Sequence, residues 1–166
     1  MKLLSSLLGL LLLFFVTMAY AAPVIEISGK VVGVHDGDTL TLLNSQKNAI
    51  KVRLAEIDAP ELRQPYGQKS KQYLSSLVFN KAVYIKVVNV DRYGRTVGRV
   101  YFQGRDINRE MIASGMAWVY RQYLKDKSLL DIEEVAKSKM VGVWSLSDKD
   151  NVPPWEWRKN SKPRNR

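Results

Sequence analysis

The sequence predicts an α+β fold, a five-stranded Greek-key barrel with three helices. Two observations support this prediction. Five short segments alternate apolar and polar residues with the period of a β-strand, and turn signals separate them. One segment with helical spacing lies between the third and fourth strands, and two more follow the fifth. The 166 residues suit one domain with a real core, and no internal repeat divides them.

The first three strands are expected to form a meander at residues 24–35, 39–42 and 50–54. Asp36-Gly37 is a turn signal between the first two strands, and the polar residues 44–48 supply the next loop. Residues 67–79 then change to the period of a helix, because apolar side chains recur on one side of it.

The fourth and fifth strands are expected at 82–90 and 97–102, around a turn at 91–94. A short helix at 108–114 ends at Gly115, and a last helix, whose apolar face includes Leu129 and Ala136, ends at Gly142. This order of elements matches a small closed Greek-key barrel of the OB type, which we expect to occupy residues 22–149.

Composition limits the possible chemistry. The chain has 26 Lys and Arg against 16 Asp and Glu, a net charge of +10. Such a surface attracts polyanions, nucleic acid before anionic membrane, although charge also serves solubility. The absence of cysteine excludes disulfides, thiol catalysis and cysteine-ligated zinc. The single histidine, His35, excludes multi-histidine metal sites, and we expect it in a surface turn, with a general acid as the alternative.

Residues 1–21 have the features of a signal peptide: Lys2, an apolar stretch at 7–16 and an A-x-A site at 19–21. We expect cleavage before Ala22 and export to the periplasm or the medium. An uncleaved membrane anchor is the alternative, because the apolar stretch approaches the roughly 20 residues that span a bilayer.

Residues 150–166 are expected to form a basic C-terminal tail that contains prolines and tryptophans. No acidic residue occurs from 158 to 166. The tail either strengthens polyanion binding or is a solvated, disordered segment.

Two acidic motifs suggest a metal site. Asp38 directly follows the turn at Asp36-Gly37, where it is either part of an ordinary hairpin or a metal ligand supported by Asp36. Asp58-Ala59-Pro60-Glu61 is more specific. Pro60 favours an extended Ala59, which leaves the Ala59 carbonyl free to face a cation. Two acids three residues apart can enter one pocket if the chain turns there, although an ordinary acidic loop is the alternative.

Two arginines and a tyrosine accompany these acids. Arg53 faces outward if its neighbours in the strand face the core, and Arg95 follows the turn at 91–94. Alone, each would be an ordinary exposed residue, but beside carboxylates the planar guanidinium suits phosphate. Tyr93, in the same turn as Arg95, is a candidate for a nucleotide contact, whereas Trp118 is expected in the core.

Together these motifs resemble the thermonuclease family, the staphylococcal-nuclease-like proteins, from about residue 26 to Trp144. The markers are DGDT (36–39), VRLAEIDAPE (52–61), Tyr66-Gly67, DRYGR (91–95), the helix containing Asn108 and GVWS (142–145). The resemblance implies an OB-fold barrel with three helices, and Ca²⁺-dependent cleavage of DNA and RNA that leaves 3′-phosphate ends.

The resemblance also implies roles for single residues. Asp38, Asp58 and the backbone carbonyl of Ala59 would be the Ca²⁺ ligands. Arg53 and Arg95 would bind the scissile phosphate, and Tyr93 would help to hold the nucleotide. Glu61 would be the general base or would orient the water.

A noncatalytic, exported OB-fold protein that binds nucleic acid is the alternative function. The sequence argues against it, because all five catalytic positions are filled: Asp38, Arg53, Asp58, Glu61 and Arg95. A membrane-tethered surface protein would explain the leader but none of the acids. Nothing in the sequence requires a protein partner, so a monomer is expected, and the choice between DNA and RNA stays open.

Overall fold

The structure is a computed structural model that describes residues 24–161. The expected signal peptide at 1–21 and the last basic residues of the tail lie outside the described residues. Within 24–161, no helix combines the length and the apolar character needed to cross a membrane.

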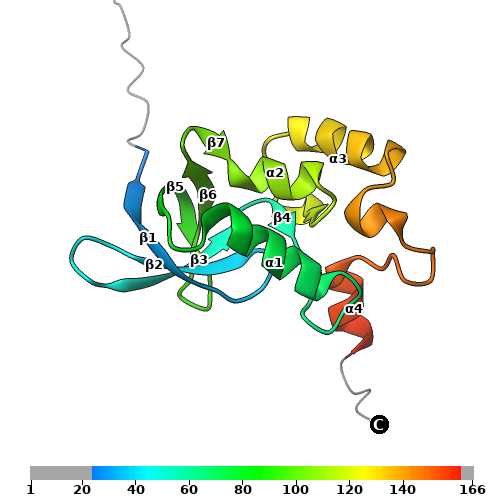
Figure 1. Cartoon of the computed structure of the whole chain (residues 1–166), viewed down its shortest axis with the longest axis horizontal. Coiled ribbons are helices and arrows are strands. Elements are labelled where there is room, and N and C mark those ends of the chain that lie inside the picture. Colours follow the sequence, from blue (N-terminus) through cyan, green and yellow to red (C-terminus); the bar gives the residue numbers. More distant parts are fainter. Residues whose placement is uncertain (1–23, 162–166) are drawn as a thin grey trace, which may run out of the picture.

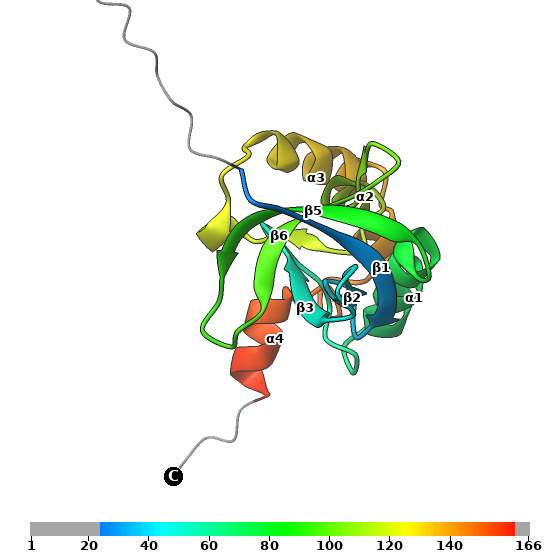
Figure 2. The same ribbon diagram turned by 90° about the vertical axis from the view of Figure 1, so that its left-hand side faces the viewer.

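Five strands form a closed barrel, as predicted (Figures 1 and 2). Neighbouring strands are antiparallel in the order β3-β2-β1-β5-β6, and β3 pairs with β6 in parallel to close the sheet. The strands are β1 (Glu26–Val34), β2 (Thr39–Leu43), β3 (Ala49–Leu54), β5 (Ala82–Val90) and β6 (Thr96–Phe102). Their bounds agree with the expected ones to within two residues at either end.

Alternation along the strands explains the barrel core. Leu40 and Leu42 of β2, and Val52 and Leu54 of β3, are almost fully buried, while the residues between them are more exposed or face the site. β1 crosses β2 closely at Gly29, where a Cβ atom would lie 2.3 Å from the Leu43 carbonyl oxygen. Glycine is therefore required at this crossing.

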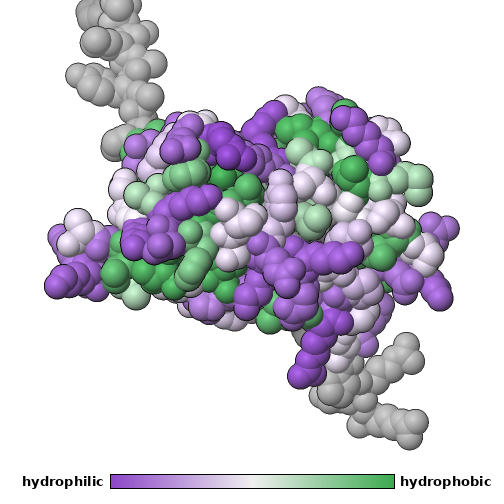
Figure 3. Space-filling view, viewed as in Figure 1, coloured by the Kyte–Doolittle hydropathy of each residue, from purple (hydrophilic) through white to green (hydrophobic). Residues whose placement is uncertain are grey.

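Three helices cover the barrel, again as predicted: α1 (Gly67–Val78), α2 (Ile107–Ala113) and α3 (Ser128–Ser138). α1 contacts β1 and α2, and α2 contacts β6 and α3. Leu74, Met111 and Leu129 are fully buried and extend the barrel core into the helical layer. On the side of the molecule shown in Figure 3, hydrophilic and hydrophobic surface areas alternate.

Short elements complete the chain. β4 (Ile57–Asp58) pairs with β8 (Trp118–Val119), and β7 (Arg105–Asp106) pairs with β6. Two 3-10 helices flank α3, η1 (Arg121–Tyr123) and η2 (Gly142–Ser145). The β4–β8 pair matters most for the site, because it fixes Asp58 beneath the barrel end.

A fourth helix, α4 (Pro154–Asn160), lies within the segment expected to be a tail. Pro154 is buried in its first turn, where the fixed φ of proline favours a helix start. Seven residues are too few to display a helical period, so the sequence pattern did not reveal it. α4 lies at the same end of the barrel as the β5–β6 turn (Figure 2).

Candidate active site

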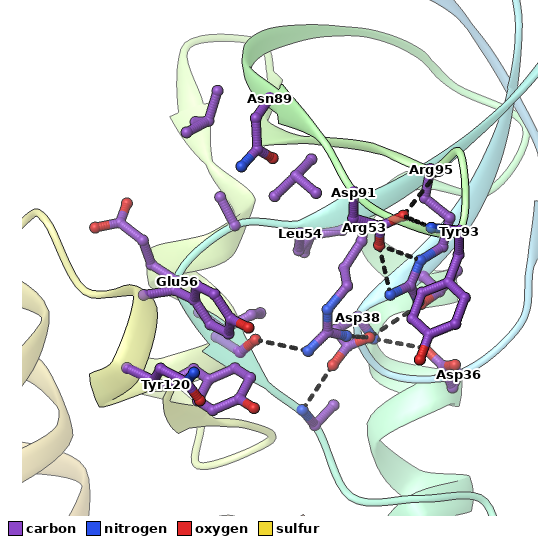
Figure 4. Close-up of a pocket in the computed structure, with 18 of the residues that line it drawn as sticks. Asp36, Asp38, Arg53, Leu54, Glu56, Asn89, Asp91, Tyr93, Arg95 and Tyr120 are labelled. Atoms are coloured by element: carbon purple, nitrogen blue, oxygen red, sulfur yellow. Dashed lines mark hydrogen bonds and ion pairs between the residues drawn. The ribbon is translucent and has the colours of Figure 1, made fainter. Parts of the chain in front are cut away.

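A cleft of about 840 Å³ opens at one end of the barrel. Its walls come from the β1–β2 turn, the segment after β3, the β5–β6 turn and α4. The charged and aromatic side chains that line it are Asp36, Asp38, Arg53, Glu56, Glu61, Asp91, Arg92, Tyr93, Arg95, Tyr120, Tyr123, Lys125 and Arg158. Figure 4 shows Arg53 in the middle of this cleft with its guanidinium directed at Asp38.

Asp38 is held firmly at the start of β2. Its carboxylate accepts hydrogen bonds from the Thr39 hydroxyl at 3.0 Å and from the Ala59 amide at 2.9 Å, and only 4% of the residue is exposed. The turn before it packs against α1, where a Cβ atom on Gly37 would lie 1.8 Å from the Ser70 hydroxyl. The predicted turn therefore places a rigid carboxylate at the cleft.

Asp36 contacts the backbone of Asp38, because its carboxylate accepts a 3.0 Å hydrogen bond from the Asp38 amide. Burial and the nearby charge of Asp38 raise the pKa of Asp36 to about 6. Asp36 and Asp38 therefore stand side by side at this end of the cleft, joined by a backbone hydrogen bond.

Arg53 links the two predicted metal ligands. Its guanidinium forms one ion pair with Asp38 and another, 2.8 Å long, with Asp58. Burial lowers the pKa of Arg53, but the two carboxylates outweigh it and hold the pKa above its ordinary value. Arg53 is therefore a fixed positive charge, with its neighbours Val52 and Leu54 buried in the core as predicted.

Asp58 lies beneath the cleft rather than on its surface, since none of its side chain is exposed. Arg53 and Arg158 cover it: Arg158 donates hydrogen bonds to both Asp58 carboxylate oxygens, at 3.2 and 2.7 Å. Burial raises the pKa of Asp58, and the hydrogen bonds from Arg158 oppose this rise.

Glu61 lies on the rim of the cleft, with 41% of its side chain exposed. It accepts a 2.7 Å hydrogen bond from Arg158, which also contacts Asp58. Asp58 and Glu61 therefore share one partner, so the predicted turn at Ala59-Pro60 does direct both acids to one place.

Arg95 and Tyr93 lie on the opposite wall, in the β5–β6 turn (Figure 4). Asp91 holds the Arg95 guanidinium at 2.7 Å, and both turn residues donate backbone amides to the same carboxylate. Tyr93 is 68% exposed. Arg95 is thus in the cleft but forms its ion pair within its own turn, whereas Arg53 bridges Asp38 and Asp58.

The donor set suits a hard cation, because the acids at this end of the cleft offer only oxygen. Within residues 24–161, however, no three His, Cys, Asp or Glu side chains are already arranged around a common metal position. Arginines occupy the carboxylates instead. Asp38, Asp58 and the Ala59 carbonyl therefore fit Ca²⁺ by chemistry, and a bound cation would have to share or replace guanidinium contacts.

Two further residues differ in their relation to the site. The His35 ring hydrogen-bonds to the Thr41 hydroxyl at 2.7 Å. Among the described residues, His35 is not one of those that line the cleft. Arg158, which was not among the predicted site residues, contacts two of them. The sequence does not indicate this contact, because Arg158 belongs to a run of basic residues and reaches the acids only through the way α4 packs on the domain.

Comparison with known proteins gives the family. Residues 51–146 match the family model described as Staphylococcal nuclease homologue. The chain is 46% identical over 154 residues to an uncharacterized endonuclease of Haemophilus influenzae, covering 93% of this chain and 84% of the relative. It is 40% identical over 148 residues to a micrococcal nuclease of Shigella flexneri, covering 82% and 83%. The chain belongs to the staphylococcal nuclease family, as its motifs predicted.

Proposed function

We propose that this protein is an exported, Ca²⁺-dependent nuclease that hydrolyses phosphodiester bonds of DNA and RNA and leaves 3′-phosphate ends. Membership of a nuclease family supports the reaction class. One observation supports the site: the Arg53 guanidinium pairs with both buried carboxylates, Asp38 and Asp58, in a cleft that Arg95 and Arg158 also line.

The arginines would stabilise the charge of the phosphoryl group. Arg53 is buried and always protonated, so it can meet the equatorial oxygens without reorganising in the transition state. Arg95 faces the same cleft from the β5–β6 turn and can contact the substrate from the other side. Tyr93, exposed beside it, can stack with a base.

Asp38, Asp58 and the Ala59 carbonyl would hold the cation. When bound, Ca²⁺ would supply positive charge next to a phosphate oxygen. Glu61 is the acid best placed to handle the attacking water, because it stands on the open rim while the other two carboxylates are buried. It acts as a general base or orients the water, and an arginine hydrogen-bonds to the leaving 5′-oxygen, which takes its proton from solvent.

A direct experiment tests this function. The purified mature protein is incubated with single-stranded DNA, duplex DNA and RNA, in Ca²⁺ or in excess chelator. We expect cleavage only with Ca²⁺, and 3′-phosphate ends when the products are mapped. Binding without cleavage in all Ca²⁺ samples would instead indicate a noncatalytic nucleic-acid-binding protein.

Export rests on the leader and has its own test. The N-terminal mass of the protein recovered from periplasm or medium should correspond to a chain that begins at Ala22. An intact N-terminus in the membrane fraction would indicate the uncleaved anchor instead.

A further inference from the structure

Arg158 occupies the two acids that the proposed reaction needs free. Its Nη2 atom lies 2.7 Å from Asp58 Oδ2, and its Nη1 atom lies 2.7 Å from Glu61 Oε1. Asp58 Oδ1 is also occupied, by Arg53 at 2.8 Å and by Arg158 at 3.2 Å. In this state, both oxygens of the buried Asp58 are hydrogen-bonded to guanidinium groups.

The position of Arg158 is set by the docking of α4. Pro154 is buried, and the indole of Trp155 stacks on the Tyr120 ring with centroids 5.6 Å apart and planes 5° from parallel. The Gln64 side chain donates a hydrogen bond to the Val152 carbonyl just before the helix. Tyr120 and Gln64 belong to two different parts of the domain, so α4 is a docked element that delivers the Arg158 side chain to the cleft.

The two arginines at Asp58 differ in how easily they can leave it. Arg53 belongs to β3, has only 16% of its side chain exposed and pairs with two carboxylates. Arg158 has 38% of its side chain exposed and belongs to the last helix. A cation that reaches Asp58 repels both guanidiniums, and the more exposed one moves at lower cost.

We propose that Arg158 is a third arginine of the active site, a substrate-positioning residue that holds Asp58 and Glu61 until a cation binds. When a cation is held by Asp58, Arg158 would give up its hydrogen bond to this carboxylate. The released guanidinium stays in the cleft, whose wall it already forms, and binds a phosphate of the nucleic acid. Cation and substrate therefore strengthen each other's binding. This inference rests on the proposed Ca²⁺-dependent function.

The charge balance of the site supports this exchange. With Arg158 in place, Glu61 is ion-paired and less available to water. With a divalent cation at Asp58, the Arg158 guanidinium would lose its Asp58 acceptor and face a like charge, so that only Glu61 would hold it and an incoming phosphate would offer a new acceptor. The planar guanidinium of arginine can bind a phosphate through two hydrogen bonds, so lysine at position 158 should bind the phosphate less well.

The test measures binding rather than turnover. Ca²⁺ is titrated into wild-type protein, Arg158→Ala and Arg158→Lys in a calorimeter, without nucleic acid. Lys159→Ala is the matched control, because Lys159 is an exposed base on the same helix. Each titration is repeated with a short phosphorothioate oligodeoxynucleotide, shown to be intact afterwards. Thermal melting confirms that each variant is folded.

We expect Arg158→Ala to bind Ca²⁺ alone roughly fivefold more tightly than wild type, the size typical of releasing a partly exposed ion pair. The oligonucleotide should strengthen Ca²⁺ binding by wild type and Lys159→Ala, and clearly less by Arg158→Ala. Arg158→Lys should lie between.

Three results would overturn the inference. Equal Ca²⁺ affinity of wild type and Arg158→Ala would show that Arg158 does not compete with the cation. Weaker affinity of Arg158→Ala would show that it organises the acids instead. Undiminished coupling to the oligonucleotide would show that it does not bind phosphate. These three results leave the proposed function standing as long as wild type binds Ca²⁺. If wild type binds no Ca²⁺, the proposed function fails together with the inference.

Discussion

Arg158 donates a 2.7 Å hydrogen bond to Asp58 although 100 positions separate the two residues in the sequence. The contact brings the last described helix into a cleft whose other lining residues lie between Asp36 and Lys125. The Asp58 side chain is therefore fully buried, and both Arg53 and Arg158 pair with it.

Arg53→Ala should slow phosphodiester cleavage by on the order of a hundredfold or more, a barrier increase of about 3 kcal/mol or more, because it removes preorganised charge at the phosphate. It should also destabilise the fold, since Asp38 loses its ion-pair partner while buried. Arg53→Lys separates the two effects, because lysine keeps the positive charge but lacks the planar guanidinium that can bind a phosphate through two hydrogen bonds. Single-turnover rates and thermal melting measure both.

The matched control is Arg105→Ala, because Arg105 pairs with Glu110 outside the cleft. This control should cleave at the wild-type rate. Near-normal turnover by folded Arg53→Ala would exclude Arg53 from the reaction.

Glu61→Gln tests the acid on the rim. We expect a loss of 10²-fold or more in rate and a different pH–rate profile, because the amide cannot accept a proton from water. Glu156→Gln is the control for a lost negative charge, because Glu156 is an exposed residue of α4. If wild type and Glu61→Gln share one profile shape, Glu61 has no acid–base role and only orients water.

Asn108→Ala should lower the free energy of unfolding by about 3 kcal/mol. The fully buried Asn108 side chain accepts a 3.0 Å bond from the Val100 amide and donates a 2.8 Å bond to the Ala55 carbonyl. The variant leaves both groups buried without a partner. Denaturant unfolding measures the loss, and the exposed Asn160→Ala should unfold like wild type.

Glu133 should make stability depend on pH below 4.5. Burial raises the pKa of Glu133, but hydrogen bonds from Arg121 and the Val119 amide outweigh it and hold the pKa below its ordinary 4.5. The stabilisation is therefore complete above 4.5 and is lost as the pH falls through the lowered pKa.

Unfolding free energies measured from pH 7 down to pH 3 check this dependence. Glu133→Gln should be less stable at pH 7 and should show a flatter decline. Glu134→Gln, 75% exposed, should follow wild type. A parallel decline for Glu133→Gln and wild type would contradict the assignment.

Most of the barrel could be predicted because its signal is local. Leu40 and Leu42 alternate with more exposed or polar neighbours in the sequence as they do in the strand, and the Asp36-Gly37 turn is marked by its own residues. Pairing of β3 with β6 is not local, and it was inferred from the order of elements rather than from any residue.

The ion pairs of the site could not be predicted from spacing. Arg53 meets Asp58 only because β4 pairs with β8 and turns the carboxylate back toward β3. Arg95 pairs with Asp91 in its own turn, a local contact that spacing does not distinguish from a free phosphate-binding arginine. Arg158 reaches Asp58 through α4, a helix too short for its pattern to be seen.

The most direct test of the central claim is Ca²⁺-dependent cleavage of single-stranded DNA by wild type and Asp58→Asn under single-turnover conditions. Asp126→Asn serves as the control, because Asp126 pairs with Arg99 and Arg109 outside the cleft lining. We expect chelator to stop wild-type cleavage, Ca²⁺ to restore it, and Asp58→Asn to lose at least a hundredfold in rate. Cleavage by wild type in excess chelator, or a wild-type rate for Asp58→Asn, would contradict the claim.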